Sequence, residues 1–180
     1  VTAAVSGSAA DLAKLNTVGA TGDAITLTVS GTTATAADLN TLNTKTSVDV
    51  NVAAVTTITG DATAVKALYA ASSDFTGLGN EAVTVTGTVS AADASIIANA
   101  TTGNVTATVT ADTATNLITN LTNAAATDAL TLTVNGATAT AADLLALDGK
   151  TSVAVKVDAT AVTGNIADVT KVFVTNAANF

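Results

Sequence analysis

The stretch that decides the fold runs from Asp23 to Val52 and reads DAITLTVSGTTATAADLNTLNTKTSVDVNV. A second stretch, from Asp128 to Val157, reads DALTLTVNGATATAADLLALDGKTSVAVKV. The two agree at 21 of 30 positions, at an offset of 105 residues. Self-similarity at a fixed offset is the mark of a repeat protein, in which each repeat buries its apolar face against its neighbours. The sequence therefore predicts an ordered repeat array and not a disordered low-complexity tract.

A shorter period lies inside the long one. Runs of alternating apolar residues begin near residues 1, 24, 48, 82, 104, 129 and 153, mostly at steps of 22 to 25 residues. The step from 48 to 82 is longer, and we assign its extra residues to an insertion at about 72–80, anchored by Tyr69 and Phe75. A last strand is expected at Val172. The prediction is a single repeat array over residues 1–180 with units of about 25 residues.

Each unit has two halves with different periods. In the first half apolar residues alternate with threonine, as in Ile25–Val29, which predicts a strand with one apolar and one polar face. The second half opens with Ser or Thr, two alanines and an aspartate. This is a capping-box pattern, which predicts the start of a short helix that packing must stabilise. It occurs with the N-cap residues Ser8, Thr35, Ser90 and Thr140.

Strands that alternate with helices at this spacing predict right-handed crossovers and a parallel sheet. The favoured fold is an α/β repeat solenoid with one parallel sheet and a single layer of short capped helices. The alternative is an open two-layer or Rossmann-like α/β sheet. In such a doubly wound sheet helices cover both faces, so its strands are continuously apolar. Threonine at every second strand position favours the solenoid.

The composition excludes most of the common catalytic and binding chemistries. The 180 residues include 41 Ala and 38 Thr but no Cys, His, Arg, Met, Trp or Pro, and the net charge is −8. Without Cys or His there is no thiolate nucleophile, imidazole base or zinc site of the usual kind. Six lysines against fourteen acids disfavour nucleic acid as a partner. No apolar run is long enough to predict a membrane span. We therefore predict a protein that is not an enzyme.

Two candidate sites follow from the repeats. If consecutive strands stack, alternate threonines share one face and form a possible interaction surface for glycan or ice. These threonines are Thr26, Thr28, Thr84, Thr86, Thr106, Thr108, Thr131 and Thr133. The simpler interpretation is that threonine suits a solvated strand face. Acidic residues recur at the turns, namely Asp23, Asp61, Glu81 and Asp128, and stacked carboxylates are a possible calcium site, although no residue is assigned as a ligand. No cofactor is otherwise expected.

The chain resembles the acidic, cysteine-free repeats of large secreted bacterial cell-surface proteins, such as surface-layer proteins, adhesins and fibrous surface proteins. The units LTLTVSG and VTVTGTVSAAD and the repeated TAADL carry this resemblance. It implies a secreted or cell-surface location. Because the chain contains no Met and begins at Val1, we expect it to be a processed piece of a longer protein.

Three hypotheses about function remain. The first is a structural repeat segment of an extracellular layer or fibre, whose partner is another copy of itself. The second is an adhesin-type binding or spacer module that holds glycan or ice through the threonine-rich face. The third, an enzyme, has no support from the side chains present. The first is favoured because the ends of a solenoid associate unless polar repeats cap them, and the sequence shows no obvious cap at either end.

Overall fold

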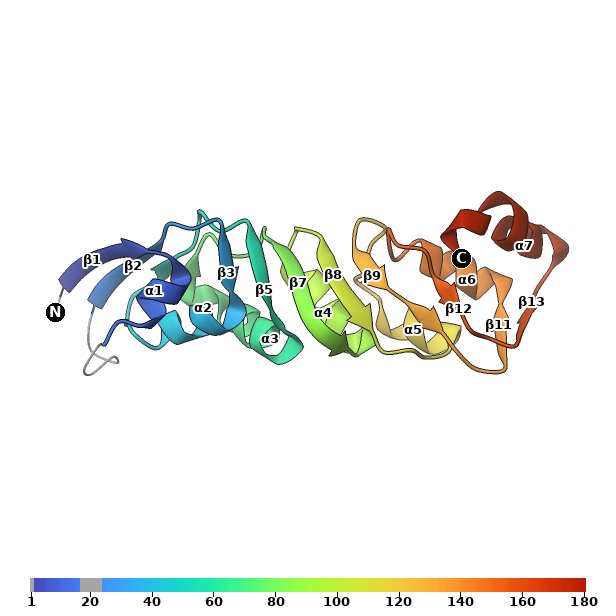
Figure 1. Ribbon diagram of the computed structural model, residues 1–180, viewed down its shortest axis with the longest axis horizontal. Coiled ribbons are helices and arrows are strands. Elements are labelled where there is room, and N and C mark those ends of the chain that lie inside the picture. The colour runs from blue at the N-terminus through green and yellow to red at the C-terminus, as the bar shows by residue number, and fades with distance from the viewer. Residues whose placement is uncertain (1, 17–23) are drawn as a thin grey trace. The chain divides into compact units, whose positions relative to one another are not determined.

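The structure, a computed structural model, describes residues 2–16 and 24–180 (Figure 1). Parallel strands alternate with short helices along the chain, so the α/β class is confirmed. The chain divides into two compact units. Unit 1 comprises Val1–Thr86 and Ala100–Gly103, and unit 2 comprises Gly87–Asn99 and Asn104–Phe180. The predicted strand start at Val1 and the turn residue Asp23 lie outside the described residues.

Unit 1 contains two runs of parallel strands. The first is a four-stranded sheet in the order β1 (Thr2–Gly7), β2 (Ala24–Val29), β4 (Val50–Asn51) and β6 (Phe75–Thr76). The second run is β3 (Thr33–Thr35), β5 (Thr57–Asp61) and the first five residues of β7 (Ala82–Val89). Paired residues lie 22 to 25 positions apart in the chain, which matches the predicted repeat length.

The two runs differ from the single sheet that we predicted. The repeat that begins with β2 supplies two strand segments, β2 and β3, because the chain turns at residues 30–32 and becomes extended again before the helix. The segment predicted as an insertion carries β6, in which the buried Phe75 pairs with Val50. Phe75 and Thr76 of this segment are therefore part of the regular pairing. The step from residue 48 to residue 82 is long because it was measured from a strand of the first sheet to a strand of the second run.

Unit 2 repeats this plan with shorter strands. Three parallel pairs form: β8 (Val105–Val109) with β9 (Ala129–Thr131), β10 (Thr133–Val134) with β12 (Lys156–Val157), and β11 (Thr138–Thr140) with β13 (Ala161–Thr163). The strands β9, β10 and β11 occupy the same sequence positions, 105 residues on, as β2 and β3 of unit 1. The 105-residue similarity is therefore a structural repeat.

The helices are short, as predicted, and pack beside their neighbours within each unit. In unit 1, α2 (Ala36–Asn43) contacts α1 (Ala9–Ala13) and α3 (Ala62–Ala70). In unit 2, α6 (Ala141–Asp148) contacts α5 (Ala114–Asn120) and α7 (Ile166–Thr170), and α4 (Ala91–Ala100) precedes them. A 3-10 turn, η1 (Ser72–Asp74), leads from α3 into β6. Helices of five to ten residues are marginal alone, so these contacts must hold them.

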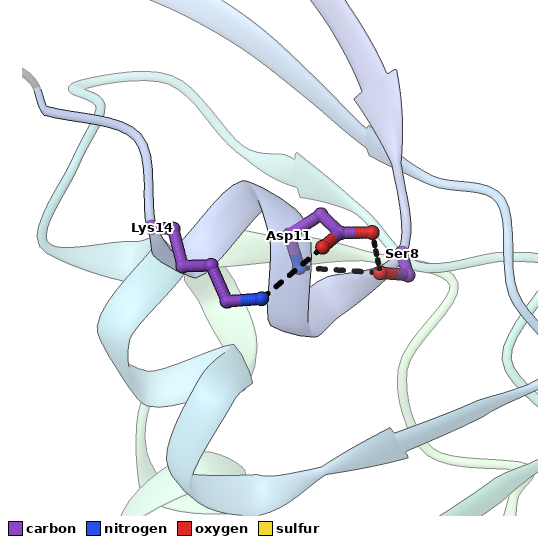
Figure 2. A network of polar contacts seen from close by, with 3 residues as sticks. All are labelled: Ser8, Asp11 and Lys14. Atoms are coloured by element: carbon purple, nitrogen blue, oxygen red, sulfur yellow. Dashed lines mark hydrogen bonds and ion pairs between the residues drawn. The ribbon is translucent and has the colours of Figure 1, made fainter.

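All four predicted helix starts are confirmed. The hydroxyls of Ser8, Thr35, Ser90 and Thr140 each accept a hydrogen bond from the backbone N–H three residues on, at 3.0–3.1 Å. Figure 2 shows the first of these caps, in which Ser8 Oγ also donates to the Asp11 carboxylate at 2.7 Å. The Lys14 ammonium lies 3.3 Å from the other Asp11 oxygen. Asp61, Thr113 and Asn165 cap further helices that the Ser/Thr-Ala-Ala-Asp pattern did not identify.

The core lies between strands and helices and consists of aliphatic side chains. In unit 1 the strand residues Leu27, Val50, Ile58 and Val83 have no exposed surface. In unit 2, Leu130 on β9 and Leu132 between β9 and β10 also have no exposed surface. The fully buried α6 leucines are Leu144 and Leu147. Alanines at the first helical position, such as Ala36 and Ala141, are also fully buried. Alternation in the strands and small residues in the helices therefore produce a thin, closely packed core.

The expected last strand at Val172 is wrong. Residues 171–175 form η2 (Lys171–Thr175), a π-helical turn that continues α7, and η3 (Ala177–Asn179) follows. No turn separates Val172 from the helix before it, so the backbone stays helical. Val172 is buried, whereas Phe173 and Val174 are 57% and 72% exposed. The carbonyl of Asn179 accepts a hydrogen bond from Val155 N–H at 2.7 Å, so this segment folds back onto unit 2.

Candidate functional site

The eight predicted threonines lie on solvated strand faces. Thr26, Thr86, Thr106, Thr108 and Thr131 are exposed, and Thr28, Thr84 and Thr133 are half-buried. The residues between them, such as Leu27, Val85 and Leu132, are buried. One wet face and one buried face are therefore present in each of these strands.

The eight threonines are distributed over more than one sheet. Thr26 and Thr28 belong to the first sheet, where Thr28 pairs with Ser6 and Asn51. Thr108 and Thr131 stand in direct register. Thr84 instead pairs with Thr59, which pairs with Thr35, so the threonine ladder of unit 1 runs through residues that the sequence did not single out. A second such pair joins Thr140 and Thr163.

The acidic residues have structural partners at the described positions. Asp11, Asp38, Asp93 and Asp143 lie in the first turns of helices, where the positive end of the helix dipole favours a negative charge. The hydrogen bond from Ser8, followed by the contact with Lys14, holds the pKa of Asp11 below its ordinary value. Asp112 has a lowered pKa because Asn116 and then the Thr113 N–H donate to its carboxylate. Within the described residues, no three acidic side chains gather as a metal site requires.

Glu81 and Asp128 are buried acids at the turns that precede strands. One carboxylate oxygen of Glu81 accepts hydrogen bonds from Gly79 N–H (2.9 Å), Asn80 N–H (3.1 Å) and the Tyr69 hydroxyl (3.3 Å). Its other oxygen has no partner among the described residues. Burial, followed by the Glu81 charge, raises the pKa of Tyr69 above its ordinary value. Asp128 accepts from Val105 N–H and Ala125 N–H, at 2.8 and 2.9 Å. Both acids therefore hold loops in place.

Buried threonines at the corners after α2, α4 and α6 form a set that the sequence analysis missed. Thr46, Thr101 and Thr151 are at most 8% exposed. Each donates its hydroxyl to a backbone carbonyl 20 or 21 residues earlier, at 2.6–2.7 Å. These bonds tie one repeat to the preceding one. The signal was present in the repeated Lys-Thr-Ser-Val of residues 45–48 and 150–153. Lys45 and Lys150 add bonds to carbonyls of the preceding repeat, at 2.7 and 3.2 Å.

A small polar cavity lies at this corner in each unit, at equivalent positions. The cavity of unit 1, about 250 Å³, is lined by Asn43, Thr46, Ser47, Val48, Asp49 and Asp74. The cavity of unit 2, about 240 Å³, is lined by Asp148, Thr151, Ser152, Val153, Ala154 and Asn179. Asn43 donates to Asp74 at 3.0 Å, and Asn179 donates to Asp148 at 3.1 Å. Between the two units the amide and the carboxylate have exchanged their equivalent positions. An amide-to-carboxylate hydrogen bond is therefore present at both corners.

Two further cavities lie beside strands that, among the residues that the structure describes, have a partner on one side only. In unit 1 a cavity of about 300 Å³ lies between Ser8–Ala10 and Thr33–Thr35, next to β3. In unit 2 an apolar cavity of about 240 Å³ lies next to β13 and includes Val162, Phe173 and Phe180 in its lining. Unpaired strand edges next to apolar surface are potential sites of strand addition.

No helix in the described part of the chain is long and apolar enough to cross a membrane. The chain matches no protein-family model, and searches of curated proteins and of solved structures gave no match. The candidate functional surfaces are therefore defined by geometry alone: the threonine ladder, the two polar corner cavities and the unpaired edges.

Proposed function

We propose that this chain is a non-catalytic structural repeat segment of an extracellular bacterial layer or fibre, and that it associates with further copies of itself. The observation that carries the proposal is that β1, β3 and β13 each have a strand partner on one side only within residues 2–16 and 24–180. Backbone N–H and C=O groups on an unpaired edge are a template for another strand. Charged residues and prolines, which normally block such edges, do not occur in any of these three strands.

The finer fold that accompanies this proposal is a solenoid. Successive repeats pair in parallel at intervals of 22 to 25 residues, and corner threonines bond each repeat to the one before it. Stability in such an array comes from interfaces between neighbouring repeats. A terminal repeat therefore gains stability from any further repeat or copy that covers it.

The surface chemistry supports an extracellular structural role. Threonine, alanine and asparagine cover long stretches of the surface, and charged residues are 11% of the chain. Such surfaces can pack together without burying unpaired ions, which would cost free energy. The chain offers no His, Cys or Arg for catalysis. The resemblance to secreted surface proteins agrees with this location.

Sedimentation velocity and negative-stain imaging of the purified chain, with and without Ca²⁺, test the proposal. We expect assemblies whose size grows with protein concentration and which appear as fibres or sheets in the images. Growth only in the presence of Ca²⁺ would support assembly and add calcium as its trigger. A strict monomer at high micromolar concentration in both conditions would overturn the proposal.

The threonine ladder of unit 1 favours a second candidate, a module that binds glycan or ice. Thr35, Thr59 and Thr84 lie side by side on adjacent strands, so their spacing follows the strand separation of about 4.8 Å. The Thr35 hydroxyl is engaged with Asp38, which shortens the row of free hydroxyls. Thermal hysteresis and glycan-array binding that Thr59→Val abolishes would favour this candidate over the structural one.

A further inference from the structure

The outer side of β13 has no strand partner in the described part of the chain. Ala161 N–H donates to Ala137 O on the side of β11. Alternate residues of a strand direct their backbone groups to opposite sides, so Val162 directs its N–H and C=O to the open side. The Val162 side chain is half-buried and lines the apolar cavity of unit 2.

Unit 1 shows what covers the equivalent edge. β3 and β11 are the same Thr-Ala-Thr segment, 105 residues apart. β5 pairs with β3, and β13 pairs with β11, so β5 and β13 are equivalent strands. The helices that follow start at Asp61 and Asn165, each preceded by a glycine. A Cβ on Gly60 or Gly164 would meet the equivalent residues Ala36 or Ala141 at 3.0 or 3.2 Å. The two glycines therefore pack alike, which supports the equivalence of β5 and β13.

In unit 1, β7 pairs with the side of β5 that faces away from β3. Ile58 pairs with Val83, and both side chains are fully buried. On the adjoining helix Tyr69 is 9% exposed, whereas Phe173 on η2 is 57% exposed. The cavity beside β13 and the exposed Phe173 are thus the surface that a strand like β7 would cover.

In the described residues β1 likewise has a strand partner on one side only. Gly7 O accepts the Ser30 N–H on the side of β2, so Ala4 and Ser6 direct their backbone groups away from β2. The segment Ala4-Val5-Ser6 has the same order of small, valine and hydroxyl residues as Ala82-Val83-Thr84, the part of β7 that pairs with β5. Like Val162, Val5 is half-buried.

Unit 2 contains a strand that resembles β1 and whose outer side is occupied. β8 pairs with β9 through Thr106 and Ala129, as β1 pairs with β2 through Thr2 and Ala24. Ser6 therefore corresponds to Thr110, and the Thr110 N–H donates to Val89 O at 2.8 Å. The backbone groups that point outward at this position of the repeat therefore form hydrogen bonds to a neighbouring strand where one is present.

We propose that β1 of one copy pairs in parallel with the outer side of β13 of a second copy, with Ala4, Val5 and Ser6 opposite Ala161, Val162 and Thr163. Val5 then enters the apolar cavity beside Val162, as Val83 packs beside Ile58 in unit 1. This contact rests on the proposed self-association and names its interface. It is heterologous, so it joins copies head to tail and extends into filaments unless the rotation closes a ring.

Cysteine pairing tests this register, because the chain has no cysteine of its own. Ser6→Cys and Thr163→Cys copies are mixed and oxidised mildly. Ser6 and Thr163 are both exposed, and the proposed register places their Cα atoms within disulfide range. We expect the mixed disulfide to form about tenfold faster than either symmetric disulfide, because association raises the effective thiol concentration. The matched control mixes Ser6→Cys with Thr131→Cys, an exposed threonine on β9, and shows no such excess.

Sedimentation of Val162→Pro provides the second measurement. Proline removes the outward N–H and leaves the Ala161 bond to β11 in place, so we expect an unchanged circular dichroism spectrum and loss of the assemblies. If wild type assembles but the mixed disulfide shows no excess over the Thr131→Cys control, the interface is wrong and the proposed function stands. If Val162→Pro remains folded and assembles like wild type, the interface is also wrong. A wild type that stays monomeric overturns both proposals.

Discussion

Two regions with nearly the same sequence plan differ in how they end. In unit 1 the helix α3 is followed by β6 and β7, and Tyr69 on α3 and Phe75 on β6 are both buried. In unit 2 the shorter α7 continues into η2, and Phe173 stays exposed. The difference teaches that a residue near the end of a repeat is buried by the next repeat and not by its own. Substitutions at equivalent positions in the two units separate the stability that comes from contacts within a repeat from the stability that comes from contacts with the next repeat.

The largest effect is expected from a charge in the strand core that both units share. Leu27 and Leu132 are equivalent and have no exposed surface. Leu132→Asp should destabilise by more than about 4 kcal/mol, because an unpaired carboxylate would enter an apolar core, and Leu27→Asp should do the same. Thermal melts followed by circular dichroism measure both. The neighbouring exposed variants Thr26→Asp and Thr131→Asp should melt close to wild type, and equal damage from them would contradict the one-wet-face strands.

Aromatic truncation tests the contrast between the units directly. Tyr69→Ala should cost about 3 kcal/mol or more, because it leaves a cavity in place of a buried ring. Phe173→Ala should cost under about 1 kcal/mol at concentrations where the chain is monomeric, because over half of the ring is already in water. Urea titrations give both values. Similar losses at the two positions would show that unit 2 buries Phe173 in solution.

Tyrosinate absorbance at alkaline pH probes unit 1 alone, since Tyr69 is the only tyrosine. Burial and the Glu81 charge raise its pKa in the folded state. Above the ordinary pKa of about 10 the unfolded chain loses this proton while the folded chain keeps it, so Tyr69 contributes less stability as pH rises further. Absorbance at 295 nm should show ionisation that coincides with unfolding. Ionisation near the ordinary pKa in a folded chain would contradict the buried site, and Tyr69→Phe should reduce the alkaline sensitivity.

The smallest effect is expected where the units are most alike. Thr35→Ala and Thr140→Ala should each cost about 1 kcal/mol, the usual cost of a lost N-cap. Their hydroxyls accept from Asp38 and Asp143 N–H with the same 3.0 Å geometry. Denaturant midpoints of the two variants should therefore shift equally, whereas Thr33→Ala, outside the cap, should shift little. Unequal shifts would show that the context of the cap differs between the units.

Local patterns predicted the local structure well. Alternation in Ile25–Val29 and Leu130–Val134 identified strands and their buried side, because neighbouring strand residues point to opposite faces. The Ser/Thr-Ala-Ala-Asp segments located four helix starts, because the cap depends on residues within one turn. The Asn43–Asp74 and Asn179–Asp148 bonds could not be predicted, because each joins residues 31 positions apart through the fold.

The sequence by itself determined the α/β class, the spacing of about 25 residues, the polar and apolar strand faces and the helix caps. Only the tertiary structure decided that a repeat such as the one with β2 and β3 supplies strands to two runs, that β6 pairs with β4, that Val172 lies in a helix and that Thr108 pairs with Thr131. The physical reason is the range of the interactions. Caps and alternation depend on neighbours in the chain, whereas register, burial and unpaired edges depend on the repeat that packs alongside.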